Sequence, residues 1–145
     1  MPAAWLVPVV FVIAAAMAFA TGTSWGSFGL LLPLAGGIIN AMDEPTMLLP
    51  VLGAVLAGAV AGDHASPISD TTILSATGSS CSVITHVITQ LPYVGSAAIC
   101  ALLGYVALAL TGSVVVGLLV LALALAAFVV VMRVVTRPLA AEPAA

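Results

Sequence analysis

The sequence predicts an all-α, polytopic membrane protein, and three observations carry this prediction. Hydrophobic residues make up 63% of the 145 residues, and the mean hydropathy is +1.36. Only 5% of the residues are charged, against about 25% in an ordinary soluble domain. The apolar residues form long stretches, and a membrane-spanning helix needs about 20 such residues in a row. We therefore expect a helical bundle in which lipid, rather than water, covers most of the surface.

The first part of the chain predicts a re-entrant helical hairpin over about residues 4–42. Residues 5–20 are apolar but short for a span, and residues 28–42 form a second short apolar arm. Between the arms lies a segment rich in Gly, Ser and Thr. Two short arms joined by such a tip are typical of a hairpin that enters and leaves on one side of the membrane. Asp43, Glu44 and Pro45 then predict a water-exposed turn.

About residues 46–80 predict one helix that is broken in its second half. Ala54, Gly58 and Gly62 recur at four-residue steps, so small residues line one face and permit close packing against another helix. Pro67 lacks a backbone donor and clashes with the preceding turn, which predicts a break within residues 63–72. The second half is expected to end at Gly78.

The rest of the chain predicts two full spans. Residues 81–90 are polar enough for a loop or an interfacial segment. Spans are expected at about residues 91–111 and 113–135, separated by a short Thr-Gly-Ser segment, and residues 136–145 are expected to form an exposed tail. Residues 1–135 thus make up one transmembrane unit.

The charges exclude some classes of protein and predict an orientation. A net charge of −3 and a sequence pI of about 4.8 leave no basic surface for nucleic acid. Cys81 and Cys100 show no CxxC spacing and predict no disulfide framework. The first basic residue is Arg133. Because early positive charges usually orient membrane proteins, we expect an upstream part to be missing. If the hairpin opens to the outside, the order of the spans places Arg133 and Arg137 in the cytoplasm, in agreement with this rule, and Asp43 and Glu44 outside.

The predicted helix break carries the candidate site for a cation or a proton. Two carboxylates bracket four hydroxyls there, and such hard oxygen ligands suit Na⁺. The predicted ligands are Asp63, Asp70, Ser66, Ser69, Thr71 and Thr72. An ionised carboxylate in an apolar interior is costly, so it must bind a cation, a proton or a partner. Na⁺ and H⁺ are therefore expected to compete for one site, with no further cofactor.

Three of the predicted site features also have a purely structural interpretation. Asp70 is also well placed to cap a helix that starts near Thr71, in a plain loop. His64 can sense pH, or it can be a hydrogen-bonded structural imidazole. The expected hairpin tip offers hydroxyls and tight turns for a site, or simply helix caps; its residues are Thr21, Gly22, Thr23, Ser24 and Gly26.

Two motifs in these segments resemble signatures of the NhaC family of sodium/proton antiporters. They are ATGTSWGSFG at residues 20–29, followed by Leu32-Pro33, and GDHASPISDTTILS at residues 62–75. TQLPY at residues 89–93 is a third, weaker match. The resemblance covers residues 4–110 and only the C-terminal part of a family member. This sequence differs from the family pattern at Ala65. It differs again after residue 81, where relatives are rich in Asp, His and basic residues and this chain has only His86.

The resemblance implies a fold and a function. It implies a transporter built from two inverted repeats, of which residues 1–135 form one half. In each repeat a hairpin tip meets a broken helix at the ion site, so residues 21–27 are expected to close a site at residues 63–72. It implies Na⁺/H⁺ antiport across the cell membrane, and a role in pH homeostasis rather than an enzymatic one. The expected partners are the lipid bilayer and the missing N-terminal half or a second copy.

Other functions remain open on the sequence. An ion-coupled exchanger of malate, lactate or amino acids uses the same scaffold, and a truncated product would be inactive. An intramembrane aspartyl protease is disfavoured, because Val60 interrupts the G-x-G-D pattern and the two Asp are seven residues apart on one broken helix.

Overall fold

The computed structural model describes residues 3–136, and within this range the chain is entirely helical apart from its turns. A 3-10 turn, η1 (Ala3–Trp5), leads into α1 (Leu6–Thr21), and α2 (Ser24–Ala41) follows. A second 3-10 turn, η2 (Pro45–Met47), leads into α3 (Leu48–Ala65), which is followed by the short α4 (Asp70–Gly78). Two long helices, α5 (Val83–Thr111) and α6 (Val114–Thr136), complete the described chain. The prediction of an all-helical protein is confirmed.

Four helical segments are long and apolar enough to cross a membrane. They are Ala3–Thr21, Pro45–Ala65, Val83–Thr111 and Val114–Val134. Together with the low charge of the chain, they identify a multi-pass membrane protein. The first segment is therefore long enough to span, although the sequence predicted a short re-entrant arm there. Whether α1 and α2 enter and leave on one side remains a prediction.

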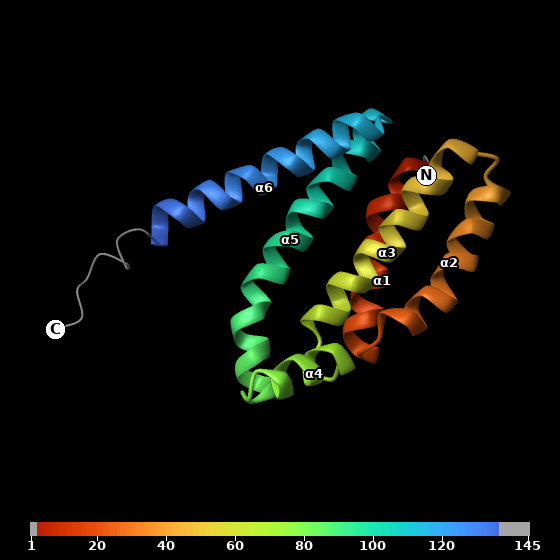
Figure 1. Ribbon diagram of the computed structural model, residues 1–145. Coiled ribbons are helices and arrows are strands. Elements are labelled where there is room, and N and C mark those ends of the chain that lie inside the picture. Colours follow the sequence, from red (N-terminus) through yellow and green to blue (C-terminus); the bar gives the residue numbers. More distant parts are fainter. Residues whose placement is uncertain (1–2, 137–145) are drawn as a thin grey trace.

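The helices run alternately up and down, so the chain connections gather at two ends (Figure 1). One end carries the turn between α2 and α3 and the turn between α5 and α6. The opposite end carries the turn between α1 and α2 and the break between α3 and α4. Both polar interruptions predicted from the sequence therefore lie at the same end of the molecule.

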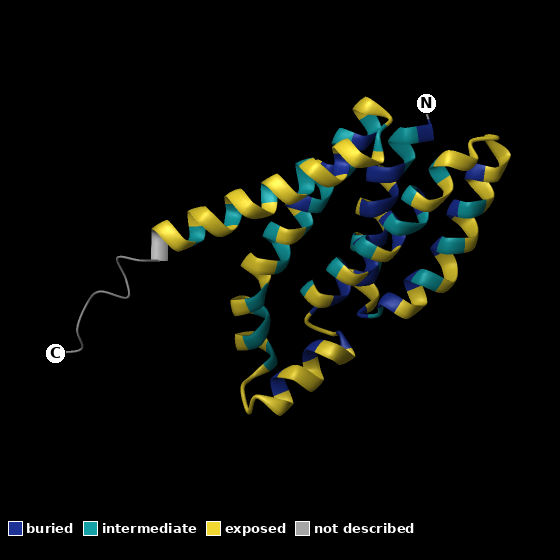
Figure 2. Cartoon of the chain, turned by 45° about the horizontal axis from the view of Figure 1, so that its top comes forward, coloured by how far each residue is buried: buried dark blue, intermediate teal, exposed yellow. Residues whose placement is uncertain are grey.

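The core lies between α1 and α3, which run side by side (Figures 1 and 2). Gly58 and Gly62 face α1, and a Cβ atom on either would collide with a backbone carbonyl, that of Phe11 or of Ala15 respectively. Ala54, on the same face, is fully buried. The small-residue face predicted from the four-residue spacing is thus the closest helix contact in this part of the molecule.

The last helix is the least enclosed part of the described chain. α6 crosses α5 near the turn at Gly112 and then diverges from it, and most of its side chains are exposed (Figures 1 and 2). At the crossing, Gly104 and Gly117 face each other, and a Cβ atom on Gly104 would lie 2.9 Å from the Gly117 carbonyl oxygen. This close glycine contact was not predicted.

The start of α5 corrects one sequence prediction. Residues 83–90 are helical, whereas residues 81–90 were expected to form a loop or an interfacial segment. The cause is an N-cap: the Ser82 hydroxyl oxygen accepts a hydrogen bond from the Thr85 backbone N–H at 3.1 Å. The 29 residues of α5 span about 43 Å at 1.5 Å per residue, more than the roughly 30 Å hydrocarbon core, so its polar first turns need not lie in lipid tails.

The remaining boundaries lie close to those predicted. The exposed turn at Asp43 and Glu44 is present, and α4 ends at Gly78 as expected. α2 begins at Ser24, so the connection between the first two helices is narrower than the predicted tip of residues 21–27. The predicted exposed tail, with Arg137 and Glu142, lies outside the described residues except for residue 136.

Candidate functional site

The first interruption is a tight turn built on a glycine. α1 ends at Thr21, and Gly22 takes the left-handed conformation at φ 69°, with its N–H donating to the Ala18 carbonyl oxygen at 2.8 Å. A residue with a Cβ is strained at this φ, which explains why glycine closes the helix. Thr23 is extended and directly precedes α2. Only two residues therefore connect the two helices.

The second interruption is the break predicted at Pro67. α3 ends at Ala65, and Ser66 and Ser69 both adopt extended backbone conformations before α4 begins at Asp70. The Ser66 N–H donates to the Asp63 carbonyl oxygen at 3.1 Å. The hydroxyl oxygen of Ser66 lies 3.4 Å from the Ile68 N–H, which donates to it. The break therefore consists of four residues held by local hydrogen bonds.

The two interruptions touch each other at Gly22 and Ile68. A Cβ atom built on Gly22 would lie 2.8 Å from the Ile68 carbonyl oxygen, so there is no room for a side chain. The turn after α1 is thus packed directly against the backbone of the break after α3. The sequence analysis expected the hairpin tip to approach the broken helix, and the structure places these segments in contact.

The buried polar side chains of the described residues all lie at these two interruptions. On the first they belong to the opening turn of α2, and on the second to the end of α3, the break and the first turn of α4. They are Ser24, Ser27, Asp63, Ser66, Ser69 and Thr72. Away from the breaks, the buried side chains are apolar. Buried polar groups cost free energy unless they are satisfied, so their concentration here marks the candidate site.

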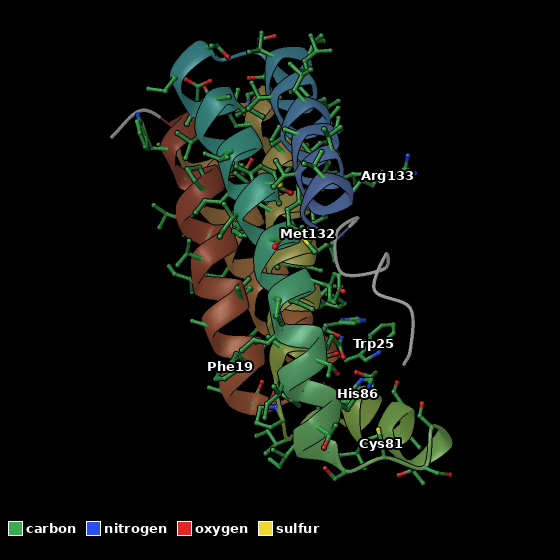
Figure 3. All side chains as sticks on the ribbon, turned by 90° about the vertical axis from the view of Figure 1, so that its left-hand side faces the viewer. Phe19, Trp25, Cys81, His86, Met132 and Arg133 are labelled. Carbon is green, nitrogen blue, oxygen red and sulfur yellow. The ribbon has the colours of Figure 1, made fainter. Side chains whose placement is uncertain are left out.

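Asp63 is the only carboxylate in this group, and it is 4% exposed. The Ser69 hydroxyl donates to Asp63 Oδ1 at 2.7 Å, and the Ser69 and Thr71 hydroxyl oxygens lie 2.8 Å apart. Arg133, the basic residue of the described range, lies far along α6 and points away from the bundle (Figure 3). Asp63 therefore has a hydroxyl partner, and no Lys or Arg side chain of the described range neutralises it.

Thr72 adds a further buried hydroxyl to the same region. It is 2% exposed, and its hydroxyl oxygen has no hydrogen-bond partner among the described residues. An unsatisfied buried hydroxyl needs an explanation, and an ion is one. With one carboxylate and several hydroxyls, the ligand set suits a monovalent hard cation better than a divalent one, which usually takes more carboxylate ligands. The described residues hold no cluster of three or more His, Cys, Asp or Glu side chains.

The predicted ligands are divided between the interior and the surface. Asp63, Ser66, Ser69 and Thr72 are buried together, whereas Asp70 and Thr71 are exposed. Asp70 Oδ1 accepts a hydrogen bond from the Thr71 backbone N–H at 2.8 Å. The second carboxylate therefore lies at the outer side of the break, at the start of α4, rather than beside the buried one.

His64 faces a different direction from its neighbour Asp63. Its side chain is exposed, and Nδ1 lies 2.9 Å from the Val60 carbonyl oxygen. It lines a groove of about 610 Å³ between α3 and α5 whose other lining residues are apolar. This arrangement matches the structural imidazole that the sequence left open, and a pH-sensing role stays a prediction.

The tip residues show the same division. Gly22 and Ser24 are buried, Thr23 is half-buried, and Thr21 and Gly26 are exposed. Ser27, the last residue of the predicted tip, is 1% exposed and donates to the Thr23 carbonyl oxygen at 3.1 Å. Its three-residue spacing from Ser24 on a helix was the signal available in the sequence, since such residues share a face.

Comparison with known proteins supports an antiporter. Residues 1–110 match the sequence profile of the Na⁺/H⁺ antiporter family. An uncharacterised protein of Haemophilus influenzae is 54% identical over 77% of this chain and 21% of its own length. A malate-2H⁺/Na⁺-lactate antiporter of Bacillus subtilis is 44% identical over 52% of this chain and 16% of its own. An arginine/ornithine antiporter of Halobacterium salinarum is 39% identical over 57% of this chain and 18% of its own length. No solved structure matches the chain.

The extent of these matches defines what they establish. The chain spans only about a fifth of the length of the relatives it matches. The family profile, by contrast, covers most of this chain, including both interruptions and the buried polar group. The resemblance to sodium/proton antiporters is thereby confirmed. The chain belongs to the Na⁺/H⁺ antiporter family.

Proposed function

We propose that this chain supplies the ion site of a secondary active Na⁺/H⁺ antiporter of the cell membrane. The observation that carries the proposal is Asp63: a buried carboxylate that is bonded to the Ser69 hydroxyl and has no Lys or Arg partner among the described residues. It lies where a broken helix meets a turn between two helices, which is how several transporters build ion sites.

Exchange follows from the cost of leaving Asp63 charged. A charged carboxylate buried in an apolar interior is costly unless it binds an ion or finds a partner. Either Na⁺ or H⁺ removes that cost, and the two cannot occupy one carboxylate oxygen at the same time. Competition for Asp63 therefore couples release of one ion to binding of the other. Ser66, Ser69 and the free hydroxyl of Thr72 are the proposed additional ligands for Na⁺.

The surface residues of the break receive complementary roles in this proposal. Asp70 and Thr71 are exposed at the start of α4, where they would attract a cation as it enters from water. The tip formed by Thr21, Gly22, Thr23, Ser24 and Gly26 would close the site from the α1–α2 side, because Gly22 already lies against Ile68. Transported Na⁺ and H⁺ are the only ligands proposed.

The transport cycle is proposed for an assembled transporter. This chain spans about a fifth of the length of its relatives, and inverted-repeat transporters place the site between two halves. We propose that a second half, or a second copy of this chain, packs against the break and leaves the start of α4 open to water. The lipid bilayer surrounds the remaining apolar surface.

The test is Na⁺-driven pH change in everted membrane vesicles that contain the assembled transporter. Asp63→Asn should abolish the exchange, because the amide neither binds a proton nor neutralises Na⁺, and Asp70→Asn should weaken it. Asp43→Asn is the matched control, since Asp43 is exposed in the turn at the opposite end of the helices. Unimpaired exchange in Asp63→Asn and Asp70→Asn would exclude this site.

A second candidate function is ion-coupled exchange of organic substrates. Two of the relatives are named for malate and lactate or for arginine and ornithine, so the same scaffold carries organic solutes in those proteins. Uptake of labelled malate, lactate or arginine driven by a Na⁺ or H⁺ gradient would favour this function. Exchange of Na⁺ for H⁺ in the absence of all these solutes favours simple antiport.

A further inference from the structure

Three oxygen atoms form a continuous hydrogen-bonded row from the surface to the buried carboxylate. The Thr71 hydroxyl oxygen lies 2.8 Å from that of Ser69, which in turn lies 2.7 Å from Asp63 Oδ1. Thr71 is exposed, Ser69 is fully buried and Asp63 is 4% exposed. Both distances are those of good O–H···O hydrogen bonds. The row therefore connects water to Asp63 without an intervening gap.

The direction of these hydrogen bonds follows from counting protons. A serine hydroxyl has one proton to donate and two lone pairs to accept with. Because Ser69 donates its proton to Asp63, it must accept from Thr71 in the remaining contact. Thr71 then has free lone pairs toward water. The row thus runs as Thr71 to Ser69 to Asp63, with each hydroxyl aligned head to tail.

We propose that the hydroxyls of Thr71 and Ser69 form a proton relay between water and Asp63. This inference rests on the proposed function, in which Asp63 carries the exchanged proton. Neither hydroxyl is proposed to change its net protonation. They are positioning residues for a proton that ends on the carboxylate.

The proton transfer balances in one concerted step. A hydronium ion gives a proton to the Thr71 oxygen, Thr71 gives its own to the Ser69 oxygen, and Ser69 gives its own to Asp63 Oδ1. One water molecule is left outside, and one neutral carboxyl group is formed inside. Afterwards Asp63 donates to Ser69 and Ser69 donates to Thr71, so the row is reversed and ready to release the proton outward.

Neighbouring groups fit this assignment. Asp70 lies beside Thr71 at the exposed end, and Thr71 donates its backbone N–H to the Asp70 carboxylate at 2.8 Å, so a negative charge attracts protons to the entrance. His64, the other titratable side chain next to Asp63 in sequence, is bonded to the Val60 carbonyl and lines the α3–α5 groove. Thr72 has no partner in the row, and its hydroxyl remains available to a cation.

The relay predicts that the outer hydroxyl controls how fast Asp63 is protonated. The experiment uses the assembled transporter in lipid nanodiscs and follows the C=O stretch of the protonated carboxyl by time-resolved infrared spectroscopy after a rapid drop in pH. The Asp63 band is the one that Asp63→Asn removes. Thr71→Val is nearly isosteric and removes the hydroxyl, whereas Thr71→Ser keeps it. Thr77→Val removes an exposed hydroxyl of the same helix that is bonded instead to the Ile73 carbonyl.

Thr71→Val should slow the rise of the Asp63 band at least about tenfold, since a positioned proton donor contributes roughly 10²- to 10⁴-fold. The final height of the band should stay unchanged. In Thr71→Ser and Thr77→Val the band should rise at the wild-type rate. Circular dichroism of each variant checks that the helices persist. A wild-type rate in Thr71→Val would overturn the relay but leave the Asp63 site standing. Absence of any band removed by Asp63→Asn would overturn both.

Discussion

Gly22 combines two constraints that are usually separate. Its φ of 69° is unfavourable for any residue with a Cβ, and the space where the Cβ would stand is taken by the backbone of Ile68. Gly112, at the turn between α5 and α6, has nearly the same φ of 67° but nothing within 4 Å of a Cβ. At Gly22 a side chain would meet both the strained conformation and the contact with Ile68, whereas at Gly112 it would meet the strained conformation alone.

Alanine at these two positions should act differently. Gly22→Ala should both destabilise the chain and impair ion exchange, because it forces the α1–α2 turn away from the break that carries the site. Gly112→Ala should cost only the strain, about 1 kcal/mol, and leave exchange intact. Vesicle exchange assays and the free energy of unfolding in detergent measure the two effects. Equal loss of exchange in both variants would contradict a role for the Gly22 contact.

The unpartnered hydroxyl of Thr72 leads to a prediction about Na⁺ affinity. If this oxygen is a ligand, Thr72→Val should weaken Na⁺ binding, and Thr72→Ser should restore most of it. Loss of one neutral ligand is expected to cost about 1 kcal/mol, a several-fold rise in the Na⁺ concentration at half-maximal exchange. Valine also relieves an unsatisfied buried hydroxyl, so the folded state should not suffer. An unchanged Na⁺ dependence in Thr72→Val would exclude Thr72 from the site.

Much of the candidate site could be predicted at the scale of residues. Asp63, Ser66, Ser69 and Thr72 were recognisable because carboxylates are rare in so apolar a chain and two of them bracket these hydroxyls within residues 63–72. Which carboxylate lies inside could not be predicted, since residue type alone does not distinguish the last turn of α3 from the first residue of α4. Asp63 is buried and Asp70 exposed because the break changes the direction of the chain between them.

At the scale of elements, the pairing of α1 with α3 depends on glycines. Gly58 lies where a Cβ would collide with the Phe11 carbonyl, and it would also lie 3.1 Å from the Ala14 Cβ. Gly53, on the same helix, has nothing within 4 Å of a Cβ. Membrane helices gain most of their association from such close backbone packing.

Alanine should therefore be costly at one glycine of α3 and harmless at the other. Gly58→Ala should lower the free energy of unfolding by about 1–3 kcal/mol, the usual range for overpacking. Gly53→Ala should be neutral or stabilising by up to about 1 kcal/mol, because alanine favours the helix. Unfolding in sodium dodecyl sulfate, followed by circular dichroism, gives both values. Equal stability of the two variants would argue against tight α1–α3 packing.

Helix boundaries could be predicted where a proline or glycine ends a helix, and less well where a capping hydrogen bond starts one. Pro67 marked the break after α3, and Gly78 marked the end of α4. The start of α5 was placed too late, because the polar residues that follow Ser82 resemble a loop in composition. The Thr85 backbone N–H donates to the Ser82 hydroxyl oxygen, and the two hydroxyl oxygens lie 2.8 Å apart. This cap starts the helix at Val83 in spite of the polar composition of the residues that follow.

At the scale of the whole molecule, the alternating helices fix which connections share a face. The turn at Asp43 and the turn at Thr111 lie at one end, and α6 runs back from it toward Arg133 (Figure 1). The sequence anticipated this order from the number of apolar segments and the positive charges. The meeting of the two polar interruptions was implied by the resemblance to sodium/proton antiporters and not by the residues alone, since that contact joins residues far apart in the chain.

Cysteine labelling tests the orientation. In a Cys81→Ser background, with Cys100 buried, Asp43→Cys and Thr111→Cys should react with a membrane-impermeant maleimide added outside intact cells. Arg133→Cys should react only in everted vesicles, because basic residues flanking a span stay in the cytoplasm. Labelling of Asp43→Cys and Thr111→Cys from opposite sides would contradict the arrangement of the helices.

The contact between Gly22 and Ile68 also has an evolutionary consequence. The nearest atom to a Cβ at position 22 is the carbonyl oxygen of Ile68, a backbone atom present in every amino acid. Substitution of Ile68, whose side chain is exposed, thus cannot make room for a side chain at position 22. Among homologues that keep this contact, position 22 should be confined to glycine, while position 68 drifts among apolar residues without a compensating change.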